Sequence, residues 1–307
     1  MGSAPALPGL RPVLKGTRVV SLALNLPGPA ALMRLRAMGA QCLKIEPPAP
    51  ASAPSGTGGD PMSQYEPRAY QDLHRGIQTR CLDLKSPVGQ RQLHRHLAKA
   101  DVLLTSFRPS ALRKLGLDWP TLHAQHPGLC LVTIVGAPGA LAEDPGHDLT
   151  YLASCDLVSG HDLPPTLYAD MGGSLLTTEA VLQCLLQRQQ PGRHHGQGLH
   201  HEVALSDAAA YLALPRHWGL TSPRGMVGGA HAGYRVYACR NGRVAVAALE
   251  PHFAARLCQV AGLEASASKD MTRKRLHQQL ETFFAAHTRH QLEGLARAHD
   301  IPLHTLP

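Results

Sequence analysis

Three side chains that could transfer protons stand where the sequence predicts that helices begin or that a hairpin ends. His147 follows Gly146 at an expected helix start, Asp170 precedes another helix, and Glu250 precedes Pro251 after a hairpin. Functional groups are often found at such positions, because a rigid scaffold holds the loops that carry them. Taken singly, Asp170 and Glu250 are better explained as helix caps. One imidazole and two carboxylates could nevertheless perform two-base proton transfer if the fold brings Glu250 to the other two.

Basic side chains gather between residues 66 and 115, where ten Lys and Arg accompany four Asp and Glu. The whole chain has a formal net charge of +8, so we expect an anionic ligand, with phosphate as the leading candidate. Arg108 follows a strand predicted at 101–106 and therefore stands at the carboxyl end of the sheet, where ligands of such folds bind. Nucleic acid is not favoured, because the aromatic side chains that stack on bases are not interleaved with this cluster.

Several well-known catalytic motifs are missing. The first strand-to-helix turn, residues 24–31, lacks the G-x-G-x-x-G fingerprint, which argues against a nicotinamide or flavin cofactor. There is no G-x-x-x-x-G-K-[ST], no G-x-S-x-G and no H-E-x-x-H motif either. The sequence therefore gives no local support to P-loop, α/β-hydrolase or zincin chemistry.

Two histidine pairs, His194-His195 and His200-His201, raise the question of a metal site. Adjacent residues of a strand point to opposite faces, so neither pair can easily bind one ion. Apart from Glu202, no Cys or carboxylate is placed to complete a ligand set. We therefore expect no metal.

The first part of the chain alternates strands and helices. This order is typical of a parallel sheet with helices on both faces, and it predicts an α/β fold with a Rossmann-like large domain over residues 1–190. Strands are predicted at 17–24, 41–46, 101–106 and 129–135, and helices at 30–39 and 88–100.

The pattern changes near residues 190–200, which are polar and contain Gly and Pro. We expect residues 191–230 to form a linker with a connecting helix. Residues 231–307 then predict a small α+β domain, beginning with a hairpin around Asn241-Gly242. The hairpin strands are expected at 234–240 and 243–249, and helices at 251–261, 273–287 and 291–299.

Composition narrows the setting of the protein. Of 307 residues, 44% are apolar, which is enough for a sizeable core, and the seven Cys show no C-x-x-C spacing. A reducing cytoplasm is the expected compartment. The apolar run 19–26 follows three basic residues as in a signal peptide, but Asn25 and Pro27 interrupt it and a buried strand explains it better. No apolar stretch reaches the ~18 residues that span a bilayer, so no membrane is expected.

Several different short motifs follow one another in a specific order along nearly the whole chain. Together they resemble the family III CoA-transferases, the CaiB/BaiF superfamily, which includes the α-methylacyl-CoA racemases. The motifs are Leu14-Lys15-Gly16, Pro27-Gly28-Pro29, Lys44-Ile45-Glu46-Pro47, Leu82-Asp83-Leu84-Lys85, Phe107-Arg108-Pro109, Gly146-His147-Asp148, Asp170-Met171-Gly172-Gly173 and Leu249-Glu250-Pro251.

The resemblance implies a large domain that binds CoA, a small domain with an acid/base residue, and an interlocked homodimer. In racemases of this family, the residue matched by His147 takes the α-proton, that matched by Asp170 supports it, and that matched by Glu250 acts from the small domain. Coenzyme A is expected only as part of an acyl-CoA substrate, with no further cofactor. The implied CoA contacts are Leu82, Asp83, Leu84 and Lys85 along the adenosine, Arg108 and Lys114 at the phosphates, and Arg75, Gly146 and Tyr151.

Three functions stay open. His147 favours racemase or epimerase chemistry, because transferases of the formyl-CoA type tend to carry an aromatic residue there. The alternative is CoA transfer between carboxylic acids, with Asp170 as the nucleophile that becomes an aspartyl-CoA thioester. The third is a non-catalytic protein that binds CoA or nucleic acid.

Four features depart from the family pattern. Pro47 replaces a frequent Arg, Ser110 replaces a Gly, and only 23 residues separate His147 from Asp170. Members also usually continue beyond the position matched by Pro307, so the interlocked dimer is expected to be incomplete or simpler here.

Overall fold

The computed structural model describes residues 9–52, 58–191 and 195–307. The chain divides into two compact units, Met1–Leu212 (unit 1) and Ala213–Pro307 (unit 2). Each unit has its own sheet and its own apolar core.

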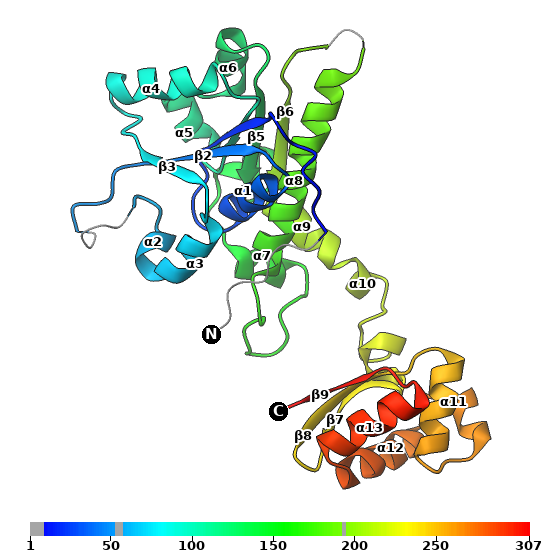
Figure 1. The fold of residues 1–307 in the computed structure, drawn as a ribbon. Helices are drawn as coiled ribbons and strands as arrows, with labels where there is room; N and C mark the ends of the chain where they lie inside the picture. Colours follow the sequence, from blue (N-terminus) through cyan, green and yellow to red (C-terminus); the bar gives the residue numbers. More distant parts are fainter. Residues whose placement is uncertain (1–8, 53–57, 192–194) are drawn as a thin grey trace. The chain divides into compact units, whose positions relative to one another are not determined.

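Unit 1 contains a six-stranded sheet with the order β3-β2-β1-β4-β5-β6, in which every neighbouring pair is parallel (Figure 1). This order reverses direction between β1 and β4, as in doubly wound dinucleotide-binding folds. The predicted α/β fold with a Rossmann-like sheet is confirmed. The strands are β1 (Arg18–Ser21), β2 (Gln41–Glu46), β3 (Gln78–Cys81), β4 (Val102–Thr105), β5 (Cys130–Val135) and β6 (His200–Ala204).

The central strands divide their side chains between two layers of helices. In β4, Val102 and Leu104 pack in the core that α1 and α8 cover, whereas Leu103 packs in the core of α4, α5 and α6. A strand covered on both faces must be apolar along its whole length, which explains the continuous runs in the sequence. The covering helices are α1 (Pro27–Ala37), α4 (Pro87–Leu97), α5 (Pro109–Lys114), α6 (Trp119–Gln125) and α8 (Tyr168–Gln189).

Local signals fix where several of these helices begin and end. Ser86 caps α4, because its hydroxyl accepts a hydrogen bond of 3.0 Å from the Gly89 backbone N–H. Asp118 caps α6 in the same way through the Thr121 N–H. After α1, the chain turns at Gly39, whose φ of +96° suits glycine.

The other elements of unit 1 lie in the connections between strands. Two short helices follow β2, and a 3-10 turn and a helix follow β5. They are α2 (Met62–Tyr65), α3 (Pro67–Leu73), η1 (Gly139–Glu143), α7 (Asp148–Ser154) and α9 (Leu205–Leu212), of which the last follows β6. Within the described ranges, no helix combines the length and hydropathy needed to cross a bilayer.

Unit 2 is a small α+β domain with a three-stranded antiparallel sheet in the order β7-β8-β9. The predicted hairpin is present, with its turn at Arg240 and Asn241, and Gly242 begins the second strand with φ +150°. Side chains of three helices, including Leu257, Leu280 and Phe284, are buried against it. The elements are β7 (Tyr234–Cys239), β8 (Gly242–Ala247), β9 (Leu303–Leu306), α10 (Leu214–His217), η2 (Met226–Ala230), α11 (Pro251–Val260), η3 (Ala265–Lys269), α12 (Lys274–Ala286) and α13 (Arg289–His299).

The structure moves the predicted boundary between the domains. The expected large domain ends at residue 190, but β6 and α9 of unit 1 lie inside the stretch 191–230 that was expected to be a linker. The physical reason is the place of β6 at the edge of the sheet, where it pairs only with β5. Edge strands tolerate polar residues, so His200, His201 and Glu202 conceal the strand in the sequence.

Candidate active site

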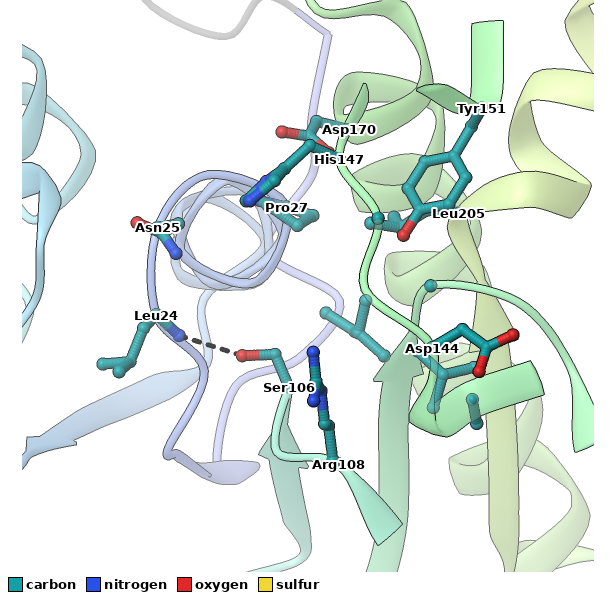
Figure 2. A pocket seen from close by; sticks show the side chains of 15 residues that line it. Leu24, Asn25, Pro27, Ser106, Arg108, Asp144, His147, Tyr151, Asp170 and Leu205 are labelled. Carbon is teal, nitrogen blue, oxygen red and sulfur yellow. Dashed lines mark hydrogen bonds between the residues drawn. The ribbon is translucent and has the colours of Figure 1, made fainter. Parts of the chain in front are cut away.

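A pocket of about 180 Å³ opens at the carboxyl ends of β1, β4 and β5 (Figure 2). This is the point where the strand order reverses, which is the usual place for a ligand in an open α/β sheet. The residues that line it come from the end of β5, from the loops after the three strands, and from α1, η1, α7, α8 and α9. They are Leu24, Asn25, Pro27, Ser106, Arg108, Ile134, Val135, Gly136, Ala142, Asp144, Gly146, His147, Tyr151, Asp170 and Leu205.

The turn between β1 and α1 forms one wall of the pocket. Asn25 adopts the left-handed conformation, with φ 62°, which is uncommon outside glycine. The Leu24 N–H donates a hydrogen bond of 3.1 Å to Ser106 Oγ after β4, which ties the two loops together (Figure 2). A Cβ on Gly28 would lie 2.2 Å from the Ala23 Cβ, so this glycine lets α1 start directly against β1.

His147 is the exposed N-cap residue of α7, and its imidazole lines the pocket (Figure 2). Its backbone N–H donates to Thr150 Oγ1 at 3.1 Å, and the Thr150 hydroxyl donates to the His147 carbonyl at 2.7 Å. These local bonds fix the start of the helix and hence the position from which the imidazole projects.

Asp170 lies in the first turn of α8, beside His147 in Figure 2. Its backbone N–H donates a hydrogen bond of 3.0 Å to Oδ1 of the buried Asp148, so α7 and α8 are joined next to the pocket. Burial and the negative charge of Asp148 raise the pKa of Asp170 to about 6, and the His147 charge opposes this shift. A carboxyl group with this pKa changes its protonation near neutral pH, as acid/base chemistry requires.

Tyr151 fills a space that two glycines leave open. A Cβ on Gly136 would lie 2.3 Å from the Tyr151 hydroxyl oxygen, and one on Gly146 would lie 2.4 Å from it. Burial raises the pKa of Tyr151, the Asp170 charge adds to this effect, and Arg108 opposes it. The phenol therefore stays protonated and offers a hydrogen-bond donor inside the pocket.

Arg108 is the N-cap residue of α5, in the loop after β4, and is exposed at the pocket. Glu143 holds the start of α5, the helix after Arg108, because its carboxylate accepts hydrogen bonds of 2.6 Å from Ser110 N and 2.8 Å from Ser110 Oγ. These two bonds, together with Arg113 at 3.7 Å, lower the pKa of Glu143. No motif pointed to Glu143, and Ser110 stood out only as a departure from the family pattern.

The predicted adenosine segment, Leu82 to Lys85, follows β3 at the edge of the sheet. Gln90 of α4 joins it to the end of α5, since its Nε2 donates to the Leu84 carbonyl at 2.7 Å and to the Leu115 carbonyl at 3.1 Å. The structure thereby brings exposed Lys85 into the same region as exposed Lys114. Sequence patterns alone could not reveal Gln90, whose two contacts are set by the tertiary fold.

Two other predicted residues lie elsewhere in the chain. Arg75 is exposed just after α3, where it forms an ion pair with Asp72. Glu250 is the exposed N-cap residue of α11 in unit 2. Its action together with His147 and Asp170 stays a prediction.

One cluster of side chains has the composition of a metal site. Among the described residues, one group of three brings candidate ligand atoms within 4.8 Å of one another, Glu46, Asp60 and His74. Lys44 Nζ already lies between these side chains, 3.3 Å from Glu46 Oε1 and 2.9 Å from His74 Nε2, so an ammonium group occupies the position of a cation. Of the histidine pairs, His194 lies outside the described residues, and His200 contacts Thr133 Oγ1 at 3.0 Å.

Comparison with known families places the chain in one family. The model of CoA-transferase family III matches residues 14–306. The chain belongs to this family. The resemblance carried by the short motifs is thereby confirmed.

Relatives within CoA-transferase family III include both reaction types. The chain is 33% identical to an alpha-methylacyl-CoA racemase of Mus musculus over 82% of its own length and 65% of that protein. It is 28% identical to a succinate--glutarate CoA-transferase of Agrobacterium fabrum over 86% of its length and 70% of that protein. The chain thus spans about two thirds of the length of these relatives.

A crystal structure of a hypothetical protein from Mycobacterium tuberculosis shares the fold. The two agree with a TM-score of 0.76 and 24% identity, over 98% of this chain and 85% of the other. This match supports the architecture alone.

Proposed function

We propose that this protein acts on acyl-CoA thioesters and moves the proton on the α-carbon. The observation that carries the proposal is the placement of His147 beside Asp170 in one pocket at the carboxyl end of the sheet. The α-proton of a thioester is acidified by the carbonyl next to it, and a positioned imidazole is the usual base for such a proton.

The proposed reaction conserves every atom. His147 accepts the α-proton through its imidazole, and the electron pair of the C–H bond moves into the thioester carbonyl to form an enolate. The Asp170 carboxylate stabilises the imidazolium that results. A proton then returns to the same carbon from the opposite face, and we assign that step to Glu250 of unit 2. Because the proton leaves from one face of the α-carbon and is added to the other, the configuration of that carbon is inverted.

The CoA moiety of the substrate is assigned to the basic side chains near the pocket. Arg108 lines the pocket, and Lys85 and Lys114 are exposed in the region that Gln90 ties together. Exposed guanidinium and ammonium groups bind phosphate oxygens well. Coenzyme A would enter only as part of the substrate.

CoA transfer is the second candidate function, favoured by the transferases among the relatives and by the Asp170 carboxylate in the pocket. Here an Asp170 oxygen attacks the thioester carbonyl and expels the CoA thiolate, giving a mixed anhydride. The thiolate then attacks the Asp170 carbonyl, which releases the donor acid and forms an aspartyl-CoA thioester. The acceptor acid reverses both steps.

The proposal extends to assembly and compartment. Tyr168, Met171 and Leu175 of α8 and Tyr211 of α9 are exposed apolar side chains, 39% to 67% accessible. Exposed apolar faces of this kind are typical of interfaces, and we assign this one to a homodimer.

All seven Cys are free thiols, which fits a reducing cytoplasm.

Mass spectrometry of an incubation with 2-methylacyl-CoA in heavy water tests the reaction. The first proposal predicts one deuterium in the substrate, lost with His147→Ala. A covalent adduct trapped by hydroxylamine during turnover with a second acid, and absent with Asp170→Ala, would favour transfer. If the protein shows neither activity, both assignments are wrong.

A further inference from the structure

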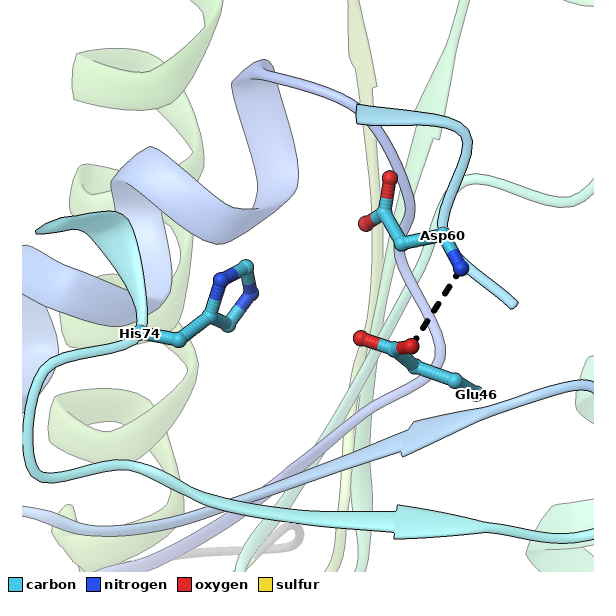
Figure 3. Close-up of side chains that lie close together, drawn as sticks. All are labelled: Glu46, Asp60 and His74. Carbon is cyan, nitrogen blue, oxygen red and sulfur yellow. Dashed lines mark hydrogen bonds between the residues drawn. The ribbon is translucent and has the colours of Figure 1, made fainter. Parts of the chain in front are cut away.

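A lysine is fully enclosed between unit 1's sheet and the segment that follows β2. Lys44 of β2 has no exposed surface, and neither has Asp60, with which its ammonium forms an ion pair. Nζ of Lys44 also lies 3.3 Å from Glu46 Oε1 and 2.9 Å from His74 Nε2. Figure 3 shows how Glu46, Asp60 and His74 face one common point.

The donors and acceptors of this cluster can be assigned from chemistry alone. An ammonium group only donates, so His74 Nε2 must accept from Lys44. A carbonyl only accepts, so His74 Nδ1 carries the proton and donates at 2.6 Å to the Tyr70 carbonyl. The Tyr70 hydroxyl donates at 2.7 Å to Glu46 Oε1. His74 is therefore neutral, with one proton, in this arrangement.

The Asp60 carboxylate joins this cluster to the reaction pocket. Both of its oxygens lie 3.2 Å from the backbone N of Asn25, the pocket residue in the left-handed conformation. Oδ1 also accepts at 2.9 Å from the Met62 N–H at the start of α2. One carboxylate therefore holds the turn after β1 and the helix after β2 together.

Two further observations concern the surroundings of this contact. A Cβ on Gly59 would lie 1.8 Å from the Pro47 carbonyl oxygen, so the chain before Asp60 passes directly against the end of β2. Tyr65 ends α2, and besides burial the charges of both Asp60 and Asp170 raise its pKa. The helix that Asp60 anchors thus lies within electrostatic reach of the candidate catalytic carboxylate.

General energetics explain why such a group would be retained. Replacement of a buried ion pair by apolar residues is often neutral or stabilising, so stability alone is a weak reason to keep one. Asparagine adopts the left-handed region more readily than other non-glycine residues, and its surroundings must still hold it there. Asp60 supplies an acceptor that holds the Asn25 backbone, and Lys44 supplies the charge that lets Asp60 stay buried.

We propose that Asp60, held by Lys44, is a positioning residue for the reaction pocket and acts through the backbone of Asn25. Asp60 does not line the pocket and touches no reacting atom. It fixes the wall formed by the β1–α1 turn, against which the acyl thioester would lie. The identity of that ligand rests on the proposed function, whereas the contact of Asp60 with Asn25 does not.

A matched pair of double variants separates the acceptor from the charge. Lys44→Met with Asp60→Asn removes both charges but keeps an oxygen that can accept from the Asn25 N–H. Lys44→Met with Asp60→Ala removes both charges and the oxygen. Comparison within the pair cancels effects of the lost ammonium on Glu46 and His74.

Hydrogen exchange of the full chain without ligand is the first measurement. We expect the Ala variant to exchange at least about tenfold faster than the Asn variant in residues 22–30, with strands β4 and β5 unchanged in both. Equal exchange in the two variants would overturn the proposal. This readout needs no substrate, so it stands even if the reaction is assigned wrongly.

Kinetics with an acyl-CoA substrate form the second measurement. The Ala variant should lose about tenfold or more in kcat relative to the Asn variant, because a misplaced wall impairs alignment of the reacting groups. Its affinity for free CoA should match that of the Asn variant. A parallel loss of kcat and of CoA affinity would indicate general damage and contradict positioning.

Asp101→Asn is the control for a structural effect elsewhere in unit 1. Like Asp60, Asp101 accepts a hydrogen bond from a backbone N–H, that of Arg18 at 2.7 Å, and it forms an ion pair with Arg188 at 2.7 Å. It precedes β4, however, and so lies at the opposite end of the sheet. We expect a lower Tm with an unchanged kcat. If Asp101→Asn loses kcat to the same extent as Lys44→Met with Asp60→Ala, the positioning role is refuted.

Discussion

Asp148 contacts Asp170 from outside the pocket lining. It accepts a hydrogen bond from the Asp170 N–H, and its charge contributes to the raised pKa of Asp170, about 6 against an ordinary 3.8. An Asn in its place keeps the acceptor oxygen and removes the charge. Comparison of the native protein with Asp148→Asn therefore separates the effect of the hydrogen bond from the effect of the charge.

We expect Asp148→Asn to lower the pKa of Asp170. In the native protein the ionised form of Asp170 is lost as pH falls through about 6, so activity should decline below that pH. In the variant the acid limb of the pH–rate profile should move to lower pH, since one opposing negative charge is gone. An acid limb that stays in place would show that burial alone sets the shift.

The contact of Tyr151 with Gly136 gives a prediction on stability. Gly136→Ala would bring a methyl group within 2.3 Å of the Tyr151 hydroxyl oxygen, and such overpacking costs about 1–3 kcal/mol. Tyr151→Phe removes that oxygen, so the double variant should be more stable than Gly136→Ala alone. Urea unfolding of the single and double variants checks this. Equal or lower stability of the double variant would contradict the proposed cause.

Sequence patterns identified the candidate reactive residues but not the residues that support them. His147, Asp170 and Arg108 stand at element ends, where the chemistry of a single residue is visible in the sequence. Asp60 and Glu143 work through contacts with residues 35 and 33 positions away, at Asn25 and Ser110. Such contacts depend on how loops return across the sheet, and no local pattern encodes that.

At the scale of elements, Gln90 links α4 to two loops that carry predicted CoA contacts. Gln90→Ala should loosen both and weaken CoA binding by up to about 30-fold, which corresponds to the loss of two hydrogen bonds of about 1 kcal/mol each, while kcat is unchanged. Isothermal titration with CoA measures the affinity. Gln183→Ala is the control, because its amide bonds only Glu179 on the exposed side of α8. Equal losses in both variants would refute the link.

The strands whose bounds the sequence predicted best lie inside the six-stranded sheet and not at its edges. The range predicted for β2 equals the observed one, and β4 and β5 differ by a residue at their ends. The strands β3, β6 and β9 escaped prediction, and each lies at an edge of its sheet. All four residues of β3 are exposed, so its side chains carry none of the apolar signal that identifies central strands.

The stability of the whole of unit 1 should depend on the neutral state of His74. Burial and the Lys44 charge lower the pKa of His74, so the folded state binds its proton less readily than the unfolded chain. Its contribution is present above the unfolded pKa of about 6.5 and is lost as pH falls below it. His74→Gln should flatten this part of the pH dependence in urea unfolding. An unchanged slope would show that other groups cause it.

Assembly of the whole molecule can be tested on the exposed face of α8. Leu175 is 50% exposed there, and Leu175→Asp should convert a dimer to monomers, because a carboxylate buried in an apolar interface is unfavourable. Sedimentation or light scattering reads the mass. Leu163→Asp, at an even more exposed leucine outside α8, should leave the dimer intact. A native protein that is monomeric would contradict the homodimer.

The enclosure of Lys44 also bears on chemical damage. Thioesters acylate free amines without any enzyme, and a protein that handles acyl-CoA would expose its own lysines to that side reaction. Lys85 and Lys114, which we assign to the CoA phosphates, are exposed and stand within range of it. Lys44 is fully buried against Asp60, Glu46 and His74. The ammonium on which the shape of the pocket depends is thus the one that the proposed substrate cannot acylate.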